Sequence, residues 1–319
     1  MYPPTQETIT VVTPSVTASN VAALLESLAN QSVELEAIVV DNGSAAHAVS
    51  DACAGHDFAR ALRLEHNAGF SAAVNHAAKR AGGGILVLVN DDSRCDPGFV
   101  ESLACALDPA AGVTMAAGVM RDARDEMLIE TAGIEIDHTL LAFDYLNGEP
   151  LATLEDGVSP PLGPSGAAAG FCKEAFLEVG GFDERLFAYW EDTDLALRMR
   201  SRGWSCALAR DALGTHAHSG TLGSGSARKN YLMGFGRGYV LRKWGALTPA
   251  RLPAILAREL PICAGQAAWD RNLAGIKGRA HGIRRAAPTE AYPAGVIATS
   301  PGGRSLARRA RRRLRLRAS

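Results

Sequence analysis

The sequence lacks three features that would assign it to a simple class of protein: a large net charge, paired cysteines and a long apolar run. Its 319 residues hold 33 lysines and arginines against 34 aspartates and glutamates, and 47 % of them are hydrophobic. This composition excludes extended disorder and fibrous repeats. At this length we expect one large α/β domain or two domains, with enough chain to bury a core.

Two of these absences concern the compartment in which the protein works. None of the six cysteines falls in a C-x-x-C pair, which disfavours a zinc knuckle or a disulfide framework and fits a reducing cytoplasm. The N-terminus has no basic region followed by an apolar stretch, so no signal peptide is predicted. The best spanning candidate, residues 252–268, is interrupted by Arg258 and Glu259. We therefore expect a cytoplasmic protein that does not cross a membrane.

The balanced total charge conceals a basic tail. Residues 304–319 contain eight arginines and no acid, which leaves the rest of the chain acidic. Leu306, Ala310 and Leu314 are four residues apart, so a helix here would carry a thin apolar stripe flanked by charge. We expect this tail either to hold the protein at the anionic inner face of the plasma membrane or to be a solvated tail. The acidic body opposes a nucleic-acid-binding role.

The first ninety residues alternate between strand and helix patterns. Apolar runs bounded by turn residues begin near residues 9, 36, 61 and 85, and helical spacing separates them. This alternation predicts a twisted, mainly parallel sheet with helices on both faces and ligands beyond the carboxyl ends of the strands. Polar residues occupy those predicted ends, at positions 13–15, 41–44, 67–70 and 90–93.

The second half is less regular. Residues 120–162 contain only weak strand signals around 129–136, and they are followed by helices predicted from Lys173 and over residues 192–202, a strand at 205–209 and further helices from Asn230. We therefore divide the chain into an α/β domain over residues 1–228, a helical extension over 229–303 and the arginine-rich tail over 304–319.

Asn90-Asp91-Asp92 follows a predicted strand that is apolar enough to be buried on both faces. Two adjacent carboxylates at the end of such a strand repel each other and lose hydration, and a hard cation with oxygen ligands relieves both costs. The motif therefore predicts a Mg²⁺ or Mn²⁺ site. A turn followed by a helix N-cap is the alternative, because Asp and Ser favour both.

A second acidic cluster, Glu191-Asp192-Thr193-Asp194, opens a predicted helix directly after Tyr189-Trp190. The helix dipole stabilises carboxylates in a first turn, so capping explains one or two of them. A carboxylate in a cleft beside aromatic rings is also partly desolvated, which raises its basicity and suits it to remove a proton from a bound hydroxyl. Within this cluster we expect Asp194 to hold the helix start.

Three further residues have both a structural and a functional interpretation. His216 and His218 follow a short strand, and either imidazole could complete a carboxylate/histidine metal shell or be a loop histidine. Asp41 follows another strand, where it could form the turn or accept a hydrogen bond from a ribose hydroxyl or a base.

Together these segments resemble the family 2 inverting nucleotide-sugar glycosyltransferases, which have the GT-A fold. The resemblance spans about residues 8–245, and within the family it is greatest to the rhamnosyltransferase and galactofuranosyltransferase branch. The segments that carry it are residues 9–13, 39–44, 67–70, 90–92, 180–184, 189–195, 202–204 and 216.

The resemblance implies roles for individual residues. It places Asp41 and Asp91 on the nucleoside, Asp92 and His216 on the Mg²⁺ or Mn²⁺ that bridges the diphosphate, and Asp192 as the catalytic base. We also expect two further groups to line the site. The donor nucleotide-binding residues would be Thr13, Pro14, Asn67 and Gly69, and the acceptor-binding residues Trp190 and Glu191. One base is sufficient for a single displacement with inversion.

The sequence departs from the family after the first strand. The family commonly has an aromatic residue and an asparagine there, whereas this chain has Thr-Pro-Ser-Val-Thr at positions 13–17. The nucleotide, uridine or thymidine diphosphate, therefore stays open. So does the choice between His216 and His218 as the metal ligand.

We predict a metal-dependent inverting glycosyltransferase that acts on a glycan or lipid-linked acceptor in bacterial cell-surface polysaccharide synthesis. The alternative is a non-catalytic binder of nucleotide sugars or glycans. A sugar nucleotidyltransferase would need a glycine-rich loop after the first strand. A dinucleotide-dependent oxidoreductase would need G-x-G-x-x-G opening the first helix, whereas Gly82-Gly83-Gly84 precedes a strand.

Overall fold

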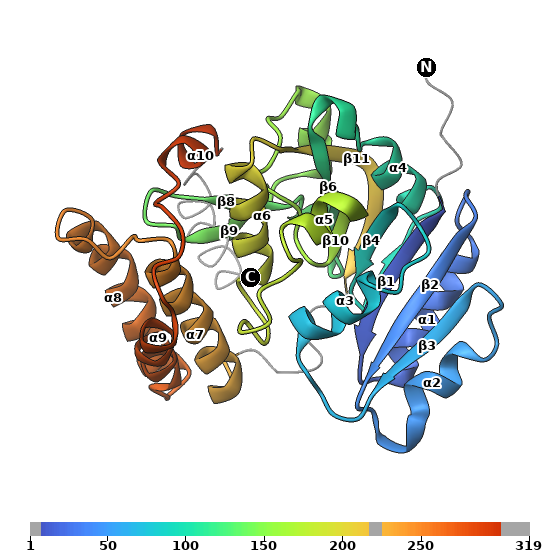
Figure 1. Cartoon of the computed structure of the whole chain (residues 1–319), viewed down its shortest axis with the longest axis horizontal. Coiled ribbons are helices and arrows are strands. Elements are labelled where there is room, and N and C mark those ends of the chain that lie inside the picture. Colours follow the sequence, from blue (N-terminus) through green and yellow to red (C-terminus); the bar gives the residue numbers. More distant parts are fainter. Residues whose placement is uncertain (1–7, 217–224, 301–319) are drawn as a thin grey trace.

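The computed structural model describes residues 8–216 and 225–300. The predictions for His218 and for the tail over 304–319 lie outside the described residues. Within the first ninety residues, strands and helices alternate as the sequence predicted (Figure 1). The elements are β1 (Ile9–Ser15), α1 (Ala18–Ala29), β2 (Leu35–Asn42), α2 (Ala48–Cys53), β3 (Ala59–Leu64), α3 (Phe70–Ala78) and β4 (Ile85–Val89).

The remaining elements follow a less regular order. They are β5 (Ser93–Cys95), α4 (Phe99–Cys105), β6 (Val113–Asp122), β7 (Asp125–Thr131), β8 (Ile134–Ile136), β9 (Ala142–Asp144), β10 (Ala168–Cys172), α5 (Lys173–Glu178), α6 (Glu191–Ser201), β11 (Ser205–His216), α7 (Ala227–Lys243), α8 (Leu252–Trp269), α9 (Ala274–Arg285) and α10 (Ala294–Thr299). Short 3₁₀ turns cover Ala45–His47, Pro109–Ala111 and Leu151–Asp156.

A nine-stranded sheet forms the centre of the fold. Its strand order is β3-β2-β1-β4-β10-β6-β11-β5, with β7 paired to β6. The strands from β3 to β4 are parallel, as the βα alternation predicted, whereas β10 runs antiparallel between β4 and β6. The α/β fold class is thus confirmed, with a mixed second half of the sheet that the sequence pattern did not distinguish.

Alternate residues of the inner strands face two separate cores. On β4, Val87 and Val89 pack with α1, α2 and α4, while Leu86 and Leu88 pack with α3, α5 and α6. A strand that is apolar on both faces is typical of a parallel sheet covered on both sides. The prediction that residues 85–89 form such a strand is confirmed.

Residues 120–162 are more ordered than the sequence indicated. They contain the end of β6, all of β7, and a two-stranded β8–β9 hairpin that packs under α6 and α7 through Ile136 and Phe143. The strands β8 and β9 have three residues each, which is too short for an alternation pattern to be detectable.

The C-terminal helices lie beside the sheet, on the left in Figure 1. Helices α7 and α9 approach each other so closely that glycines of each face the backbone of the other. A Cβ atom on Gly234 would lie 2.1 Å from the carbonyl oxygen of Gly275, and one on Gly278 would lie 2.2 Å from that of Tyr231. Among the described residues, no helix is both long and apolar enough to span a bilayer.

Candidate active site

Sheet register brings the predicted metal ligands together. Strand β11 ends at His216, which pairs with Ser93 of β5, the residue that follows Asp92. The His216 Nε2 atom consequently lies 2.9 Å from Asp92 Oδ1, although the two residues are far apart in the sequence. The other ring nitrogen, Nδ1, lies 3.0 Å from Glu130 Oε1 on β7. His216 is thus held between two carboxylates at the end of β4.

The charges of His216, Asp92 and Glu130 change the pKa values of His216 and Asp92. Burial alone would lower the pKa of His216, but hydrogen bonds and charges from Asp92 and Glu130 outweigh it and raise this pKa to about 10. Burial would raise the pKa of Asp92, and the hydrogen bond and charge of His216 instead lower it below its usual value. The position is therefore one where the protein stabilises a positive charge.

Asp92 and His216 fit the predicted divalent cation. Mg²⁺ and Mn²⁺ are commonly held by one or two protein ligands together with water and phosphate oxygens. A carboxylate on the second nitrogen of a ligating histidine, as Glu130 provides here, is the usual outer partner of a metal-bound imidazole. The described residues include no set of three or more acidic, histidine or cysteine side chains placed to hold a metal, so substrate oxygens would have to complete the shell.

Asp91 lies beside the end of β1. Its carboxylate accepts a hydrogen bond from the Ser15 hydroxyl, and burial raises its pKa, with the charge of Asp92 adding to the effect. The Thr13 hydroxyl donates to the carbonyl oxygen of Val89 at 2.9 Å, which ties β1 to β4. Pro14, which lies between Thr13 and Ser15 in β1, is half-buried. The structure thus brings Thr13, Pro14 and Asp91 to one edge of the sheet.

Asp41 is fully buried at the end of β2. It accepts hydrogen bonds from the Ser44 backbone and the Ser50 hydroxyl, and it forms an ion pair with Arg63 at 2.6 Å. Burial would raise the pKa of Asp41, but these hydrogen bonds lower it. These contacts match the turn-forming interpretation of this residue. A contact between Asp41 and a nucleoside stays a prediction.

The loop after β3 is fixed against the loop before α6. Asn67 is exposed and accepts a hydrogen bond from the Gly69 backbone, while Asn42 accepts one from Ala68. Gly69 has φ +88°, and a Cβ atom there would lie 2.5 Å from the carbonyl oxygen of Phe187. Only glycine allows this approach, which aligns Asn67 and Gly69 with the aromatic segment that leads into α6.

That aromatic segment has an unusual backbone. Tyr189 and Trp190 have φ values of 71° and 76°, and two successive left-handed residues other than glycine are costly. Gly236 of α7 makes room for them, because a Cβ atom there would lie 2.5 Å from Trp190 Cδ1. The guanidinium of the next residue, buried Arg237, lies 5.3 Å from the centre of the Trp190 ring. Helix α7 therefore holds this segment in place.

Glu191 and Asp192 begin α6 directly after the strained pair. Burial raises the pKa of Glu191 to about 8, and the neighbouring charge of Asp192 adds to the rise. Burial also raises the pKa of Asp192, to about 6. Asp192 Oδ1 accepts a hydrogen bond from its neighbour's backbone, the Thr193 N–H, at 2.6 Å. A carboxylate with this pKa is ionised at neutral pH and more basic than an exposed one, as a general base should be.

Asp192 is also close to the end of β4. The Gly166 backbone donates a hydrogen bond to it, and Gly166 lies two residues before Ala168, whose register partner is Val89. Val89 in turn directly precedes Asn90 and Asp91. The predicted base and the predicted metal ligands are therefore at the same edge of the sheet.

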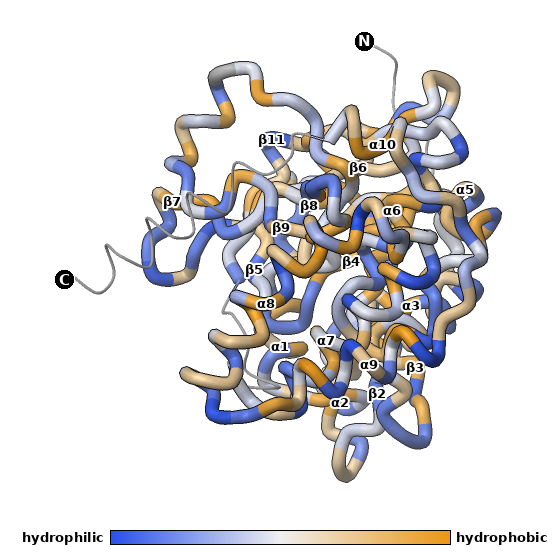
Figure 2. The backbone as a smooth tube through the Cα atoms, turned by 90° about the vertical axis from the view of Figure 1, so that its left-hand side faces the viewer, coloured by the Kyte–Doolittle hydropathy of each residue, from blue (hydrophilic) through white to orange (hydrophobic). Residues whose placement is uncertain are grey.

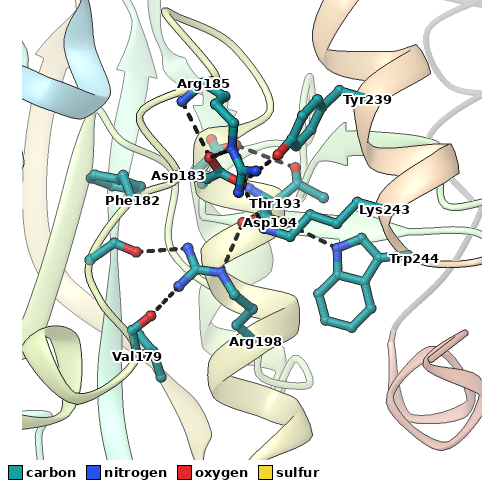
Figure 3. A network of polar contacts seen from close by, with 12 residues as sticks. Val179, Phe182, Asp183, Arg185, Thr193, Asp194, Arg198, Tyr239, Lys243 and Trp244 are labelled. Atoms are coloured by element: carbon teal, nitrogen blue, oxygen red, sulfur yellow. Dashed lines mark hydrogen bonds and ion pairs between the residues drawn. The ribbon is translucent and has the colours of Figure 1, made fainter. Parts of the chain in front are cut away.

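Asp194 has a structural role, as expected. It is fully buried and forms ion pairs with Arg198 at 2.8 Å and Lys243 at 2.8 Å, while Trp244 donates to it from its indole nitrogen (Figure 3). Lys243 also pairs with Asp183 at 2.9 Å. These contacts join the start of α6, the preceding loop and the end of α7.

Glu130, Gly236 and Arg237 are not predicted from the sequence. Glu130 lies in a short strand with no recognisable motif, and its role depends on β7 pairing with β6. The sequence does contain one signal for Gly236, because two glycines at positions 236 and 238 are unusual inside a predicted helix. Such glycines indicate that another segment packs closely against the helix, but they do not identify that segment.

Comparisons with known proteins agree with this geometry. Residues 10–129 match the sequence model of glycosyl transferase family 2. An N-acetylglucosaminyl-diphospho-decaprenol L-rhamnosyltransferase of Mycobacterium tuberculosis is 29 % identical over 210 residues, which is 57 % of this chain and 67 % of the relative. The O-antigen biosynthesis protein RfbC of Myxococcus xanthus is 28 % identical over 155 residues, 44 % of this chain and 12 % of that protein.

Two solved structures share the fold. GalNAc-T7, solved with UDP, GalNAc and Mn²⁺, matches with a TM-score of 0.65 at 13 % identity, over 93 % of this chain and 57 % of that one. The mannosyltransferase PcManGT of Pyrobaculum calidifontis, solved with GDP-Man and Mn²⁺, matches with a TM-score of 0.55 at 18 % identity, over 93 % of this chain and 80 % of that one. The chain thus spans little more than half the length of GalNAc-T7. With this sheet topology, the chain has the GT-A fold of glycosyltransferases, and its residues 10–129 carry the sequence signature of glycosyltransferase family 2.

Proposed function

We propose that the protein moves a sugar from a nucleoside-diphosphate sugar to a hydroxyl of a glycan or lipid-linked acceptor, with inversion, during synthesis of a bacterial cell-surface polysaccharide. The observation that carries this proposal is the meeting of Asp92 and His216 beside Asp91 at the end of β4. The named rhamnosyltransferase relative, which acts on a diphospho-decaprenol compound, supports the acceptor class.

Asp92 and His216 would hold Mg²⁺ or Mn²⁺. When bound, the cation would supply positive charge against the diphosphate leaving group. The contribution of this chain is to keep the His216 ring fixed: Glu130 accepts a hydrogen bond from Nδ1, which leaves Nε2 directed at Asp92.

Asp192 would accept the proton of the attacking hydroxyl. A single displacement at the anomeric carbon needs one such base and inverts the configuration, because the hydroxyl enters on the face opposite the departing diphosphate. The raised pKa makes Asp192 a stronger base than an exposed carboxylate. The rigid start of α6, held by Asp194, would keep the carboxylate aimed at the acceptor.

The donor nucleoside would lie along the strand ends that carry Asp91, Asp41 and the loop of Asn67 and Gly69, with Thr13 and Pro14 at the base of the site. The acceptor would contact Trp190 and Glu191. Both are buried, and among residues 8–216 and 225–300 nothing forms a hydrogen bond with Trp190 Nε1 or Glu191 Oε2. Burying such atoms without a partner is costly, and hydroxyls of an acceptor sugar would satisfy them.

The decisive experiment is a panel of uridine- and thymidine-diphosphate sugars, each mixed with a soluble analogue of a lipid-linked acceptor. It is assayed for release of the nucleoside diphosphate with Mn²⁺ or Mg²⁺ and for thermal stabilisation. We expect one donor class to give metal-dependent release that chelation abolishes. A non-catalytic binder would instead show stabilisation in proportion to affinity, with no release under any condition, and that result would overturn the proposal.

A further inference from the structure

Helix α8 exposes apolar side chains to the surface of the protein. Its exposed residues are apolar along the whole length of the helix. One row of them recurs every four residues: Leu252, Leu256, Leu260, Ala264 and Ala268. A second exposed set consists of Pro253, Ala257, Pro261 and Trp269. Leu260 is 63 % exposed and Trp269 is 67 % exposed. A helix on the surface of a globular protein normally turns such a stripe inward.

The charged residues of α8 point into the protein instead. Glu259 is buried and forms ion pairs with Arg237 of α7 and Arg279 of α9, each at 2.6 Å. Arg258 pairs with Asp137 at 3.0 Å. The helix is therefore held by these ion pairs together with buried Ile255, and its leucines are left outward. Figure 1 shows α8 at the outer edge of the molecule, away from the sheet, and Figure 2 views the molecule from that side.

The border of this apolar face is basic. Arg271, Lys277, Arg284 and Arg285 are exposed on α9 and on the turn before it, next to exposed Leu273 and Ile276. Residues 251–285 contain seven basic residues and only two acids. Of those acids, Glu259 is buried in its ion pairs and Asp270 accepts a hydrogen bond from Asn230. No exposed acid interrupts the surface in this part of the described chain.

We propose that the α8 face, meaning Leu252, Leu256, Leu260, Trp269, Leu273 and Ile276 with its basic border, docks the protein on a bilayer that contains anionic lipids. An apolar face bordered by lysine and arginine, with tryptophan at one end, is the arrangement that lies in a membrane interface. The bilayer offers both an apolar layer for the leucines and negative headgroups for the border.

Charge favours this occupant over the two others. A second copy would bring an identical basic border against the first, and like charges at an interface repel. The segment 304–319 of this chain is also strongly basic, so its charge does not complement the face either. The proposal concerns binding to lipid and does not rest on the proposed glycosyl transfer. It moves the expected membrane contact from the tail to α8.

The test is co-sedimentation of the full chain, without donor or acceptor, with vesicles of phosphatidylcholine alone or with added phosphatidylglycerol. The wild type should bind the anionic vesicles, and binding should weaken at high salt. Leu256→Glu/Leu260→Glu should bind at least about tenfold more weakly, because it places charge where the apolar contact is made. Lys277→Glu and Arg284→Glu should each weaken binding about fivefold or more, since each basic residue near an anionic surface is worth about 1 kcal/mol.

Met127→Glu is the matched control, because Met127 is 68 % exposed but belongs to β7. It should bind vesicles like the wild type. Circular dichroism and thermal unfolding would show that each variant is folded, and Leu256→Gln/Leu260→Gln is the substitute if the glutamate pair is not.

Any of four results would overturn the proposal. The first is wild-type protein that binds no vesicles. The second is equal binding by the leucine variant and Met127→Glu. The third is loss of binding on deletion of residues 301–319 with none on substitution of the leucines, which would assign the membrane contact to the tail. A wild-type dimer that the leucine variant converts to a monomer, with vesicle binding unchanged, would assign the face to a second copy.

Discussion

Replacing Asp192 with asparagine tests the centre of the proposed mechanism. The amide keeps the shape of the side chain and can still accept the hydrogen bond that the carboxylate takes from the Thr193 backbone at 2.6 Å. The start of α6 should therefore persist, since Asp194 and not Asp192 forms its ion pairs with α7. What is lost is the capacity to take up a proton.

The expected loss of turnover follows from the role of Asp192 as a general base. Loss of a positioned general base lowers turnover by about 10²–10⁴-fold. The wild type should show the pH dependence of its base: with a pKa of about 6, roughly one-tenth of Asp192 is ionised at pH 5 and roughly nine-tenths at pH 7, so turnover rises about tenfold over this interval. Turnover rises and does not fall with pH, because only the ionised carboxylate accepts a proton.

The assay is the initial rate of nucleotide release at saturating donor and acceptor, from pH 5 to pH 8, beside calorimetric measurement of donor affinity. Asp192→Asn should lose turnover and the rise near pH 6 while its donor affinity stays within about twofold. Glu191→Gln is the matched control, since it neutralises the adjacent buried carboxyl. Because burial raises the pKa of Glu191 to about 8, this side chain is mostly protonated at pH 7, and its replacement should mainly weaken acceptor binding.

Two outcomes would refute the assignment. If donor affinity falls in step with turnover, Asp192 is a binding or folding residue. If Glu191→Gln loses turnover and the pH profile while Asp192→Asn keeps both, the base is Glu191.

Three further predictions concern the metal site and the packing of the helices. Asp92→Ala should abolish Mn²⁺- or Mg²⁺-stimulated release with unchanged circular dichroism, and full wild-type activity in excess chelator would contradict the role of Asp92. Asp194→Ala leaves the Lys243 charge buried with less compensation, so it should lower the free energy of unfolding in denaturant titration by about 3–5 kcal/mol. Gly278→Ala should cost about 1–3 kcal/mol in the same titration, because its Cβ would meet a backbone oxygen of α7, whereas Gly295→Ala, with open space around it, should be neutral or slightly stabilising.

Local patterns predicted the half of the fold that is built from strand–helix units. The βα alternation placed β1 to β4 correctly because one or more helices follow each of the first three strands, and all four strands are parallel, although β4 pairs with β1 and not with β3. Strand β10 is different: it enters between β4 and β6, and nothing in residues 168–172 specifies that long-range insertion. The hairpin of β8 and β9 was missed because its strands are too short to show a period.

The candidate site likewise contains residues that short motifs predicted and residues that depend on long-range packing. Asp92, His216 and Asp192 were proposed from short motifs, and the structure brings them to one edge of the sheet, although their roles stay predictions. Asp41 has its turn-forming contacts, which the sequence had left as one of two interpretations. The partners Glu130 and Arg237 could not be found, because each acts through a contact that exists only once distant segments have packed.

The left-handed backbone at Tyr189 and Trp190 has a consequence for how the enzyme is made. The groups that hold this segment, Gly236, Arg237 and Lys243, are synthesised later, and Lys243 comes 49 residues after Asp194. On a ribosome, the strands β1 to β4 can therefore form before the segment that leads into α6 has any support. A chain that ended at residue 228 would keep Tyr189 and Trp190 but lack the part of α7 that holds their left-handed backbone in place.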